Sequence, residues 1–305
     1  MIVRTKRLLM EYQNLTLEQK IDHSYGTIEQ FLNKVSNPVI LFSGGKDSTV
    51  LLHFIRKVMK IDIPAIFINT GNEYPEIIKF VKTFDNVTII RPKHTIKKII
   101  EKYGFPLISK EYSKMLYECK KGTKQSSRYL TGLRSDGQPS KFILPKKYRH
   151  IIESPFYCSD KCCNFLKKNI AKNINSITAT MASESTLRSF SWIRTGCNNF
   201  GKVSTSNPFS IWKESDIFEY KRYFGIKFCD VYEDPRITRT GCMFCGFGTN
   251  FEHLSRFEYL MENYPKLYNY FLNLQNNGIS YETALNTVGV ILPHQSHYQR
   301  NIFSK

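Results

Sequence analysis

Short apolar runs alternate with amphipathic stretches through the first third of the chain. The strand-like runs, rich in β-branched and aromatic residues, are residues 38–43, 63–70 and 87–92, with a later run at 176–182. Between them, residues 48–60 and the stretch that starts at Pro75 have helical spacing. Such alternation predicts βαβ units and a parallel sheet. We therefore predict an α/β fold with a doubly wound, mostly parallel sheet.

Both ends of the chain have a helical pattern. Residues 1–35 carry apolar positions at helical spacing, with Thr16 as a capping residue, and the alternation ends after Asp234. The pattern predicts an N-terminal helical lead-in (1–35), an α/β domain (36–235) and a helical C-terminal region that begins with a C-x-x-C loop (236–305).

Residues 120–150 interrupt the α/β pattern with a basic insertion rich in Gly, Ser and Pro. The insertion contains nine Lys or Arg residues and one acid, Asp136. Loops of this length are usually functional or disordered, so contact with nucleic acid and a merely solvated insertion both remain open.

The charge balance is strongly positive. The chain has 44 Lys and Arg against 26 Asp and Glu, a formal charge of +18, which favours a nucleic-acid partner over a merely basic surface. No apolar run approaches the roughly 20 residues that span a bilayer, and charges interrupt the N-terminal apolar patches. We expect a cytoplasmic protein with no membrane partner.

The stretch "VILFSGGKDSTVLL" (39–52) predicts a phosphate-binding loop between a strand and a helix. Glycine backbone at a helix N-terminus makes an anion site, hydroxyls add donors, and Lys46 adds a positive charge. Asp47 is a candidate ligand of Mg²⁺. The loop lacks the Walker A spacing. Its candidate ATP-binding residues are Ser43, Gly44, Gly45, Lys46, Asp47, Ser48 and Thr49.

This loop resembles the SGGxDS loop of the PP-loop ATP pyrophosphatase superfamily (adenine nucleotide alpha hydrolase-like), whose members split ATP between its α and β phosphates and form adenylated intermediates. Further segments resemble the phosphoadenylyl-sulfate (PAPS) and adenylyl-sulfate (APS) reductase family, in the family's order. They are "FINTGNEYPEIIKFV" (67–81), "GFPLISK" (104–110), "KCCNFLKKNIAKNI" (161–174), "MASESTLRS" (181–189), "NPFSIWKESDIFEY" (207–220) and "GCMFCGF" (241–247).

The resemblance implies further nucleotide contacts beyond the loop. They would come from Asn69, Thr70, Gly71, Glu73, Glu184, Ser185 and Arg188. The family often has Arg where this chain has Met181, which is a departure from the pattern.

The eight cysteines, in a chain expected in a reducing compartment, favour metal or redox chemistry over disulfides. Cys162 and Cys163 with Cys242 and Cys245 resemble the [4Fe–4S] ligand set of the iron–sulfur branch of the reductases. A four-cysteine zinc site and free thiols remain alternatives. Among the single cysteines Cys119, Cys158, Cys197 and Cys229, which we expect to be buried, Cys197 is the candidate sulfur carrier.

Two departures from the reductases shape the functional hypothesis. No cysteine follows Cys245, although the family carries its nucleophile in an E-C-G-[IL]-H tail, and the phosphate loop is intact, although it is commonly degenerate in reductases. The resemblance therefore implies an ATP-dependent sulfurtransferase on nucleic acid, as in DNA phosphorothioation or tRNA thiolation.

In this hypothesis Lys46, Asp47 and Arg188 act in catalysis with Mg²⁺, and a cysteine desulfurase donates the sulfur to what we expect to be a homodimer. The alternatives are a PAPS or APS reductase whose nucleophile has moved, and a non-catalytic nucleotide- or DNA-binding subunit.

Overall fold

A computed structural model describes residues 3–249 and 255–295, so the end of the cysteine-free tail, from residue 296, lies outside the described residues. The chain forms two compact units that interleave along the sequence. The first comprises Met1–Asn69, Tyr74–Arg91 and Ile170–Asp234, and the second comprises Thr70–Glu73, Pro92–Asn169 and Pro235–Lys305. The predicted lead-in belongs to the first unit and the basic insertion to the second.

The first unit is built on a six-stranded sheet in the order β3-β2-β1-β5-β7-β6. Every neighbouring pair is parallel except β6 with β7, which confirms the predicted mostly parallel α/β fold. The strands are β1 (Val39–Leu41), β2 (Ala65–Ile68), β3 (Val87–Ile90), β5 (Ser176–Ile177), β6 (Asn198–Asn199) and β7 (Thr205–Ser206). The strand order reverses between β1 and β5, and ligands of open α/β sheets bind at such a switch point.

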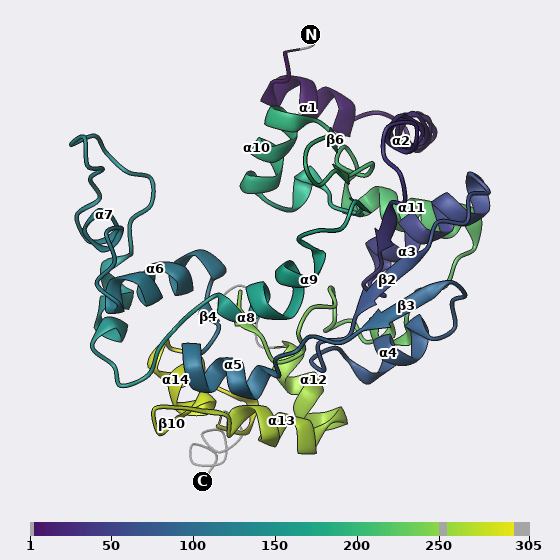
Figure 1. Cartoon of the computed structure of the whole chain (residues 1–305). Helices are drawn as coiled ribbons and strands as arrows, with labels where there is room; N and C mark the ends of the chain where they lie inside the picture. The colour runs from purple at the N-terminus through teal and green to yellow at the C-terminus, as the bar shows by residue number, and fades with distance from the viewer. Residues whose placement is uncertain (1–2, 250–254, 296–305) are drawn as a thin grey trace. The chain divides into compact units, whose positions relative to one another are not determined.

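Helices surround this sheet, and Figure 1 shows α3 and α4 close to the adjacent strands β2 and β3. The helices of the first unit are α1 (Lys6–Gln13), α2 (Leu17–Leu32), α3 (Lys46–His53) with a π-helical turn (Phe54–Val58), α4 (Pro75–Val81), α10 (Thr186–Thr195) and α11 (Glu214–Phe224), with short 3₁₀ turns at Ala182–Glu184 and Asp230–Glu233. The predicted cap at Thr16 is confirmed, because its side chain and that of Gln19 form a capping box.

The core of the first unit contains a charged pair beside aromatic rings. Trp212 is fully buried, stacks on Phe209 with ring centroids 4.1 Å apart, and donates its indole N–H to Ser24 Oγ at 2.9 Å. Nearby, Lys20 Nζ on α2 lies 2.6 Å from Asp216 Oδ2 on α11. This buried pair joins the helical lead-in to the α/β body.

The second unit is mainly helical. Its helices are α5 (Ile96–Tyr103), α6 (Lys110–Lys120), α7 (Ser126–Thr131), the 3₁₀ helix η2 (Lys146–Ile152), α8 (Lys161–Cys163) with a π-helical turn (Asn164–Lys168), α12 (Ser255–Asn263), α13 (Pro265–Leu272) and α14 (Tyr281–Thr287), and α9 (Asn169–Ala171) leads back to the first unit. Two small sheets pair β4 (Leu107–Ile108) with β8 (Gly246–Phe247) and β9 (Gln275–Asn276) with β10 (Ile279–Ser280).

The C-terminal region, which the sequence predicts to be helical, contains α12, α13 and α14. The basic insertion differs from the predicted loop, because α7 lies within it and Leu133 pairs with Pro139 across a short turn. Within residues 3–249 and 255–295, no helix combines the length and the apolar character that a membrane span needs.

Candidate nucleotide site and cysteine cluster

The phosphate loop joins the end of β1 to the start of α3, as the sequence predicts. Gly44 has φ of 72°, and a Cβ atom there would lie 2.8 Å from Val81 Cγ2 and 2.9 Å from Ile77 Cγ2 of α4. Both the left-handed backbone and this contact exclude a side chain. Glycine therefore lets α4 pack directly against the loop.

Hydroxyl groups of the loop hold its backbone in a closed turn. Ser48 Oγ accepts from Ser43 N at 3.2 Å and donates to Gly45 O at 3.0 Å. Thr49 Oγ1 donates to the same carbonyl at 3.0 Å. These bonds shape the loop at the N-terminus of α3, where helix dipole and backbone N–H groups favour an anion such as phosphate.

Lys46 lies buried in the loop beside an acid from a distant segment. Its Nζ atom lies 3.0 Å from Glu214 Oε1 at the start of α11, and its backbone N–H donates to Tyr232 Oη at 3.1 Å. Burial disfavours the ammonium ion, but the charges of Asp47 and Glu214 outweigh it and raise the pKa of Lys46. The lysine is therefore charged at neutral pH.

Asp47 has the character of a cation ligand. Its Oδ1 atom is buried and has no hydrogen-bond partner within the described residues. Burial raises the pKa of Asp47, although the positive charges of Lys46 and Arg188 oppose the shift. A buried carboxylate oxygen that lacks a donor fits Mg²⁺, which binds proteins through one or two carboxylates and takes its remaining ligands from phosphates and water.

The segment after β5, in the first unit, carries Glu184, Ser185 and Arg188. The positive charge of Arg188 acts to lower the pKa of Asp47. Ser185 caps α10 by accepting from Arg188 N at 3.3 Å, and Arg188 forms an ion pair with Glu184. Met181, at the position where the family often has Arg, is buried. The carboxyl ends of β1 and β5 are neighbours in the sheet, so this segment flanks the phosphate loop.

The segment after β2 divides between the two units. Asn69 ends the strand in the first unit, whereas Thr70, Gly71 and Glu73 belong to the second. The Glu73 carboxylate is buried and accepts from Thr70 N at 2.9 Å and Thr70 Oγ1 at 2.8 Å. It also pairs with Lys167 Nζ at 3.5 Å. The Glu73 carboxylate, which the resemblance predicts to contact the nucleotide, is therefore already bound to Thr70 and Lys167 within the second unit.

The four cysteines of the predicted cluster lie together in the second unit. Cys162 and Cys163 are on α8, and Cys242 and Cys245 form a tight turn before β8, with Cys245 N donating to Cys242 O at 3.1 Å. A hydrogen bond from Cys162 lowers the pKa of Cys163 to about 6, and the charges of Lys110 and Lys167 assist. Burial raises the pKa of Cys242 to about 12.

The four thiols lie near one another. The hydrogen bond with Cys163, burial, and the charges of Cys245 and Cys242 all raise the pKa of Cys162. Within residues 3–249 and 255–295, no group of three His, Cys, Asp or Glu side chains is arranged around a single ion position. Four thiolates are nevertheless the donors that an iron–sulfur cluster takes, and two lysines neutralise part of their charge.

Of the remaining cysteines, Cys119, Cys158 and Cys229 are buried, as expected, whereas Cys197 is half-buried. Burial raises the pKa of Cys158 to about 12 and that of Cys229 to about 11, and it also raises the pKa of Cys119. Burial likewise raises the pKa of Cys197, the candidate sulfur carrier. A protonated thiol is a poor nucleophile, so the raised pKa does not favour Cys197 in that role.

Three residues of these sites do not follow from sequence patterns. Glu214 stands in the "WKESD" segment, but nothing in that segment indicates that it meets Lys46. Lys167 follows Cys163 by about one helical turn, which is a weak signal. Tyr232 has no signal, because it reaches the loop from a 3₁₀ turn near the end of the first unit.

The first unit is an α/β fold with a glycine-containing loop at the switch point of its sheet, a place suited to an anion such as phosphate. The sequence model of the phosphoadenosine phosphosulfate reductase domain matches residues 37–246, and the chain belongs to this family. Among curated proteins, sulfate adenylyltransferase subunit 2 of Vibrio vulnificus is 30% identical over 133 residues, covering 42% of this chain and 39% of that protein. The chain thus spans about two fifths of the length of such relatives.

Two solved structures are similar at low identity. The PAPS reductase from Candida auris in complex with phosphate has a TM-score of 0.39 and 12% identity, covering 76% of this chain and 93% of that one. The U34-tRNA thiolase NcsA from Methanococcus maripaludis, with its [4Fe-4S] cluster, has a TM-score of 0.36 and 14% identity, covering 90% of this chain and 82% of that one.

Proposed function

We propose that this chain is an ATP-dependent sulfurtransferase that adenylates an acceptor oxygen on nucleic acid and replaces that oxygen with sulfur. The observation that carries the proposal is the intact phosphate loop, in which a buried lysine and a buried, unpaired carboxylate oxygen stand at a helix N-terminus. Such an arrangement suits cleavage of ATP.

In the first half-reaction the acceptor oxygen attacks the α phosphorus of ATP, and the bond to the bridging oxygen breaks so that pyrophosphate leaves. Lys46 and Arg188 stabilise the negative charge on the phosphates, and Asp47 would hold a Mg²⁺ ion, which would neutralise more of that charge. The relative from Vibrio vulnificus is a sulfate adenylyltransferase subunit, which agrees with this half-reaction.

In the second half-reaction the terminal sulfur of a persulfide attacks the activated carbon or phosphorus of the acceptor, and AMP leaves with the former acceptor oxygen. A thiol then cleaves the resulting disulfide and leaves the sulfur on the acceptor. We propose a cysteine desulfurase as the persulfide source. Cys162, Cys163, Cys242 and Cys245 would hold a [4Fe–4S] cluster, and because these four thiolates would ligate all four irons, the sulfur would come directly from the persulfide.

The partners and setting are part of the same proposal. The formal charge of +18 supports a nucleic-acid substrate, DNA or tRNA. We further propose that the protein acts in the cytoplasm as a homodimer.

A second candidate is reduction of PAPS or APS, because the family is named for that reaction. The absence of a cysteine after Cys245 requires its nucleophile to come from elsewhere in the chain or from a partner. A third candidate, a non-catalytic nucleotide- or DNA-binding subunit, would cleave neither ATP nor sulfonucleotide.

One experiment distinguishes the three. Anaerobically purified protein is incubated with ATP, APS or PAPS, with and without DNA or tRNA, while pyrophosphate, AMP and sulfite are measured. We expect pyrophosphate release from ATP that nucleic acid stimulates, and its loss in Ser43→Ala combined with Lys46→Ala. Lys57→Ala, an exposed lysine on the same helical run, is the control. Sulfite release without ATP would overturn the proposal in favour of the reductase.

A further inference from the structure

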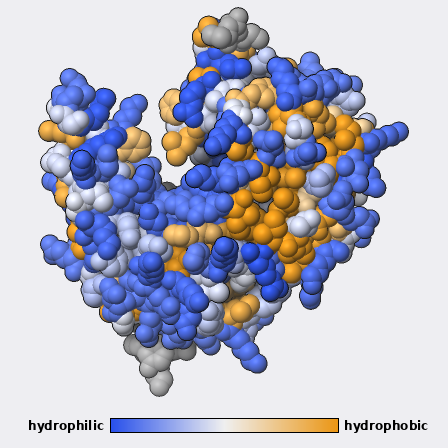
Figure 2. Space-filling model, viewed as in Figure 1, coloured by the Kyte–Doolittle hydropathy of each residue, from blue (hydrophilic) through white to orange (hydrophobic). Residues whose placement is uncertain are grey.

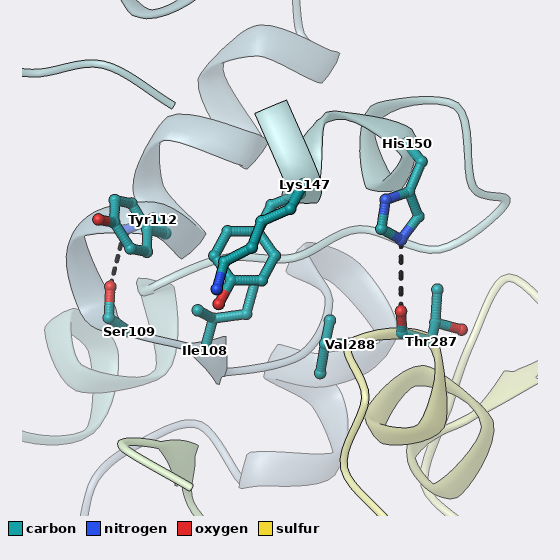
Figure 3. A pocket seen from close by; sticks show the side chains of 8 residues that line it. Ile108, Ser109, Tyr112, Lys147, His150, Thr287 and Val288 are labelled. Atoms are coloured by element: carbon teal, nitrogen blue, oxygen red, sulfur yellow. Dashed lines mark hydrogen bonds between the residues drawn. The ribbon is translucent and has the colours of Figure 1, made fainter. Parts of the chain in front are cut away.

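The second unit has an open pocket that belongs neither to the phosphate loop nor to the cysteine cluster. Its volume is about 540 Å³, and it lies between the start of α6, the helix η2 and the end of α14. Figure 3 shows Tyr112, Lys147 and His150 around it, with Ile108 and Val288 at its base. This volume is within the range of small-molecule sites.

Aromatic and apolar groups form the body of the pocket. The rings of Tyr112 and Tyr148 lie 5.7 Å apart, centroid to centroid, at an angle of 45°. Tyr148 is buried and Tyr112 is half-buried, so Tyr112 offers ring surface to a ligand. A flat ring that enters the pocket can stack on this surface, with Ile108 and Val288 beneath it.

The backbone at the base of the pocket is strained. Ile108 has φ of 63°, a left-handed conformation that is rare for a β-branched residue. Two contacts hold it there, since Ile108 pairs with Phe247 in the β4–β8 ladder and its carbonyl accepts from Gly248 N at 2.9 Å. Ser109, the next residue, accepts from Tyr112 N at 3.1 Å and so caps α6. Strain held by such contacts is concentrated at binding sites.

Basic groups stand at the mouth of the pocket. Lys147 Nζ lies 4.8 Å from the centroid of the Tyr148 ring, and His150 Nε2 lies 3.3 Å from Thr287 O. Both side chains are exposed, and none of the described residues that line the pocket carries a carboxylate. The mouth therefore favours a negatively charged group, while the body favours a flat ring.

The surrounding surface has the same character over a larger area. Residues 120–150 are basic, and three apolar residues of this stretch, Leu133, Phe142 and Ile143, are exposed. Cations stack on aromatic rings here, with Arg128 4.8 Å from the Phe142 centroid. Figure 2 shows a mostly hydrophilic surface over α6 and α7. Alternating cations and aromatic rings are typical of surfaces that bind single-stranded nucleic acid.

We propose that this pocket binds one unpaired nucleotide of a nucleic-acid strand, with its base against Tyr112 and its phosphate at Lys147 and His150, while residues 120–150 bind the neighbouring backbone. The inference rests on the proposed function in taking nucleic acid as the substrate. The inference adds the place where the strand binds. It also specifies that the protein recognises an unpaired strand and not a duplex.

The test measures binding of the full chain to fluorescently labelled oligonucleotides by anisotropy, without ATP. The probes are a single-stranded DNA, the RNA of the same sequence and the DNA duplex. We expect Tyr112→Leu to weaken single-strand binding about tenfold, while Tyr112→Phe, which keeps the ring, binds as the wild type does. Lys147→Ala should weaken it less and reduce the slope of affinity against salt by about one.

Lys114→Ala removes an exposed lysine from α6 outside the pocket and is the matched control for charge. Unchanged single-strand affinity in both Tyr112→Leu and Lys147→Ala would overturn the proposal, and so would an equal loss of duplex and single-strand binding. Free AMP or UMP that competes as well as the strand would show a mononucleotide site instead. Thermal unfolding of each variant excludes loss of folding as the cause.

Pyrophosphate release by the wild-type protein is measured in parallel, which separates this inference from the proposed function. If the wild-type protein releases no pyrophosphate but Tyr112→Leu weakens single-strand binding, the pocket inference stands and the sulfurtransferase proposal fails. If nucleic acid still stimulates pyrophosphate release in Tyr112→Leu and Lys147→Ala, and both variants bind the single strand as the wild type does, the sulfurtransferase proposal stands and the pocket inference fails.

Discussion

The ammonium group of Lys46 in the phosphate loop lies 3.0 Å from the carboxylate of Glu214 at the start of α11. The Lys46 side chain is buried, whereas 61% of the Glu214 side chain is exposed. Glu214 thus pairs with the ammonium group that an ATP phosphate would contact, and the negative charge of Glu214 would repel that phosphate. Under the proposed function, the nucleotide would displace this carboxylate when it binds.

Glu214→Gln is therefore expected to strengthen ATP binding. Because the pair is half-exposed and worth about 0.2–1 kcal/mol, the gain in affinity should be about 1.4- to fivefold at low salt. Calorimetric titration with ATP and Mg²⁺ measures it, with Glu219→Gln, exposed on the same helix, as the control. Weaker binding in the presence of Mg²⁺ would instead mean that Glu214 helps to hold the metal.

Gly44→Ala should disable the loop. The added Cβ meets Val81 and Ile77 at less than 3 Å, and φ of 72° is unfavourable for alanine, so we expect a loss of about 1–3 kcal/mol in unfolding free energy and much weaker ATP binding. Urea unfolding and nucleotide titration measure the two effects. Gly26→Ala, on α2 with no atom within 4 Å of the added Cβ, should be neutral or stabilising.

The proposed cluster distinguishes the half-buried Cys245 from the buried Cys158. Cys245→Ser should lower the iron and sulfide content of anaerobically purified protein, because a cluster needs its four thiolates, while Cys158→Ser should retain both. Iron and acid-labile sulfide are measured per chain. Stoichiometric zinc with iron and sulfide near zero would identify the site as a zinc site.

Lys20→Met should be strongly destabilising. It leaves the Asp216 carboxylate buried without its ammonium partner, at a cost of about 3–5 kcal/mol in unfolding free energy. Adding Asp216→Asn removes the unpaired charge and keeps an acceptor for the Lys213 backbone N–H, so the double variant should recover part of the loss. Additive effects in this double-mutant cycle would contradict the coupling.

The stability of the first unit should fall in mild acid. Burial lowers the pKa of His23 below 6.5, and its buried Nδ1 has no hydrogen-bond partner within the described residues. As the pH falls through 6.5, the unfolded chain binds a proton that the folded chain does not, so stability decreases. Thermal unfolding from neutral to mildly acidic pH should show a smaller decrease in His23→Phe. Equal slopes for both proteins would exclude His23 as the cause.

Local patterns in the sequence predict much of the first unit. The alternation of apolar runs and helices is a property of neighbouring residues, and the structure has β1, β2 and β3 within the predicted runs and α4 at Pro75. The "SGGKDS" loop is equally local, since glycine conformation, hydroxyl donors and a helix N-terminus all lie within seven residues. The Thr16 cap follows from the same kind of local chemistry.

Only the packed chain brings distant segments together, because side-chain pairing depends on tertiary contacts that no periodicity encodes. Glu214 meets Lys46 because α11 packs against α3, and Glu73 is held by Lys167 and Thr70 because residues 70–73 join the second unit. The pocket of Tyr112 and Lys147 likewise forms where α6, η2 and α14 converge. Adjacent residues of the sequence thus determine the chemistry of the phosphate loop. The pairing of Lys46 with Glu214 and the pocket of the second unit depend on tertiary packing.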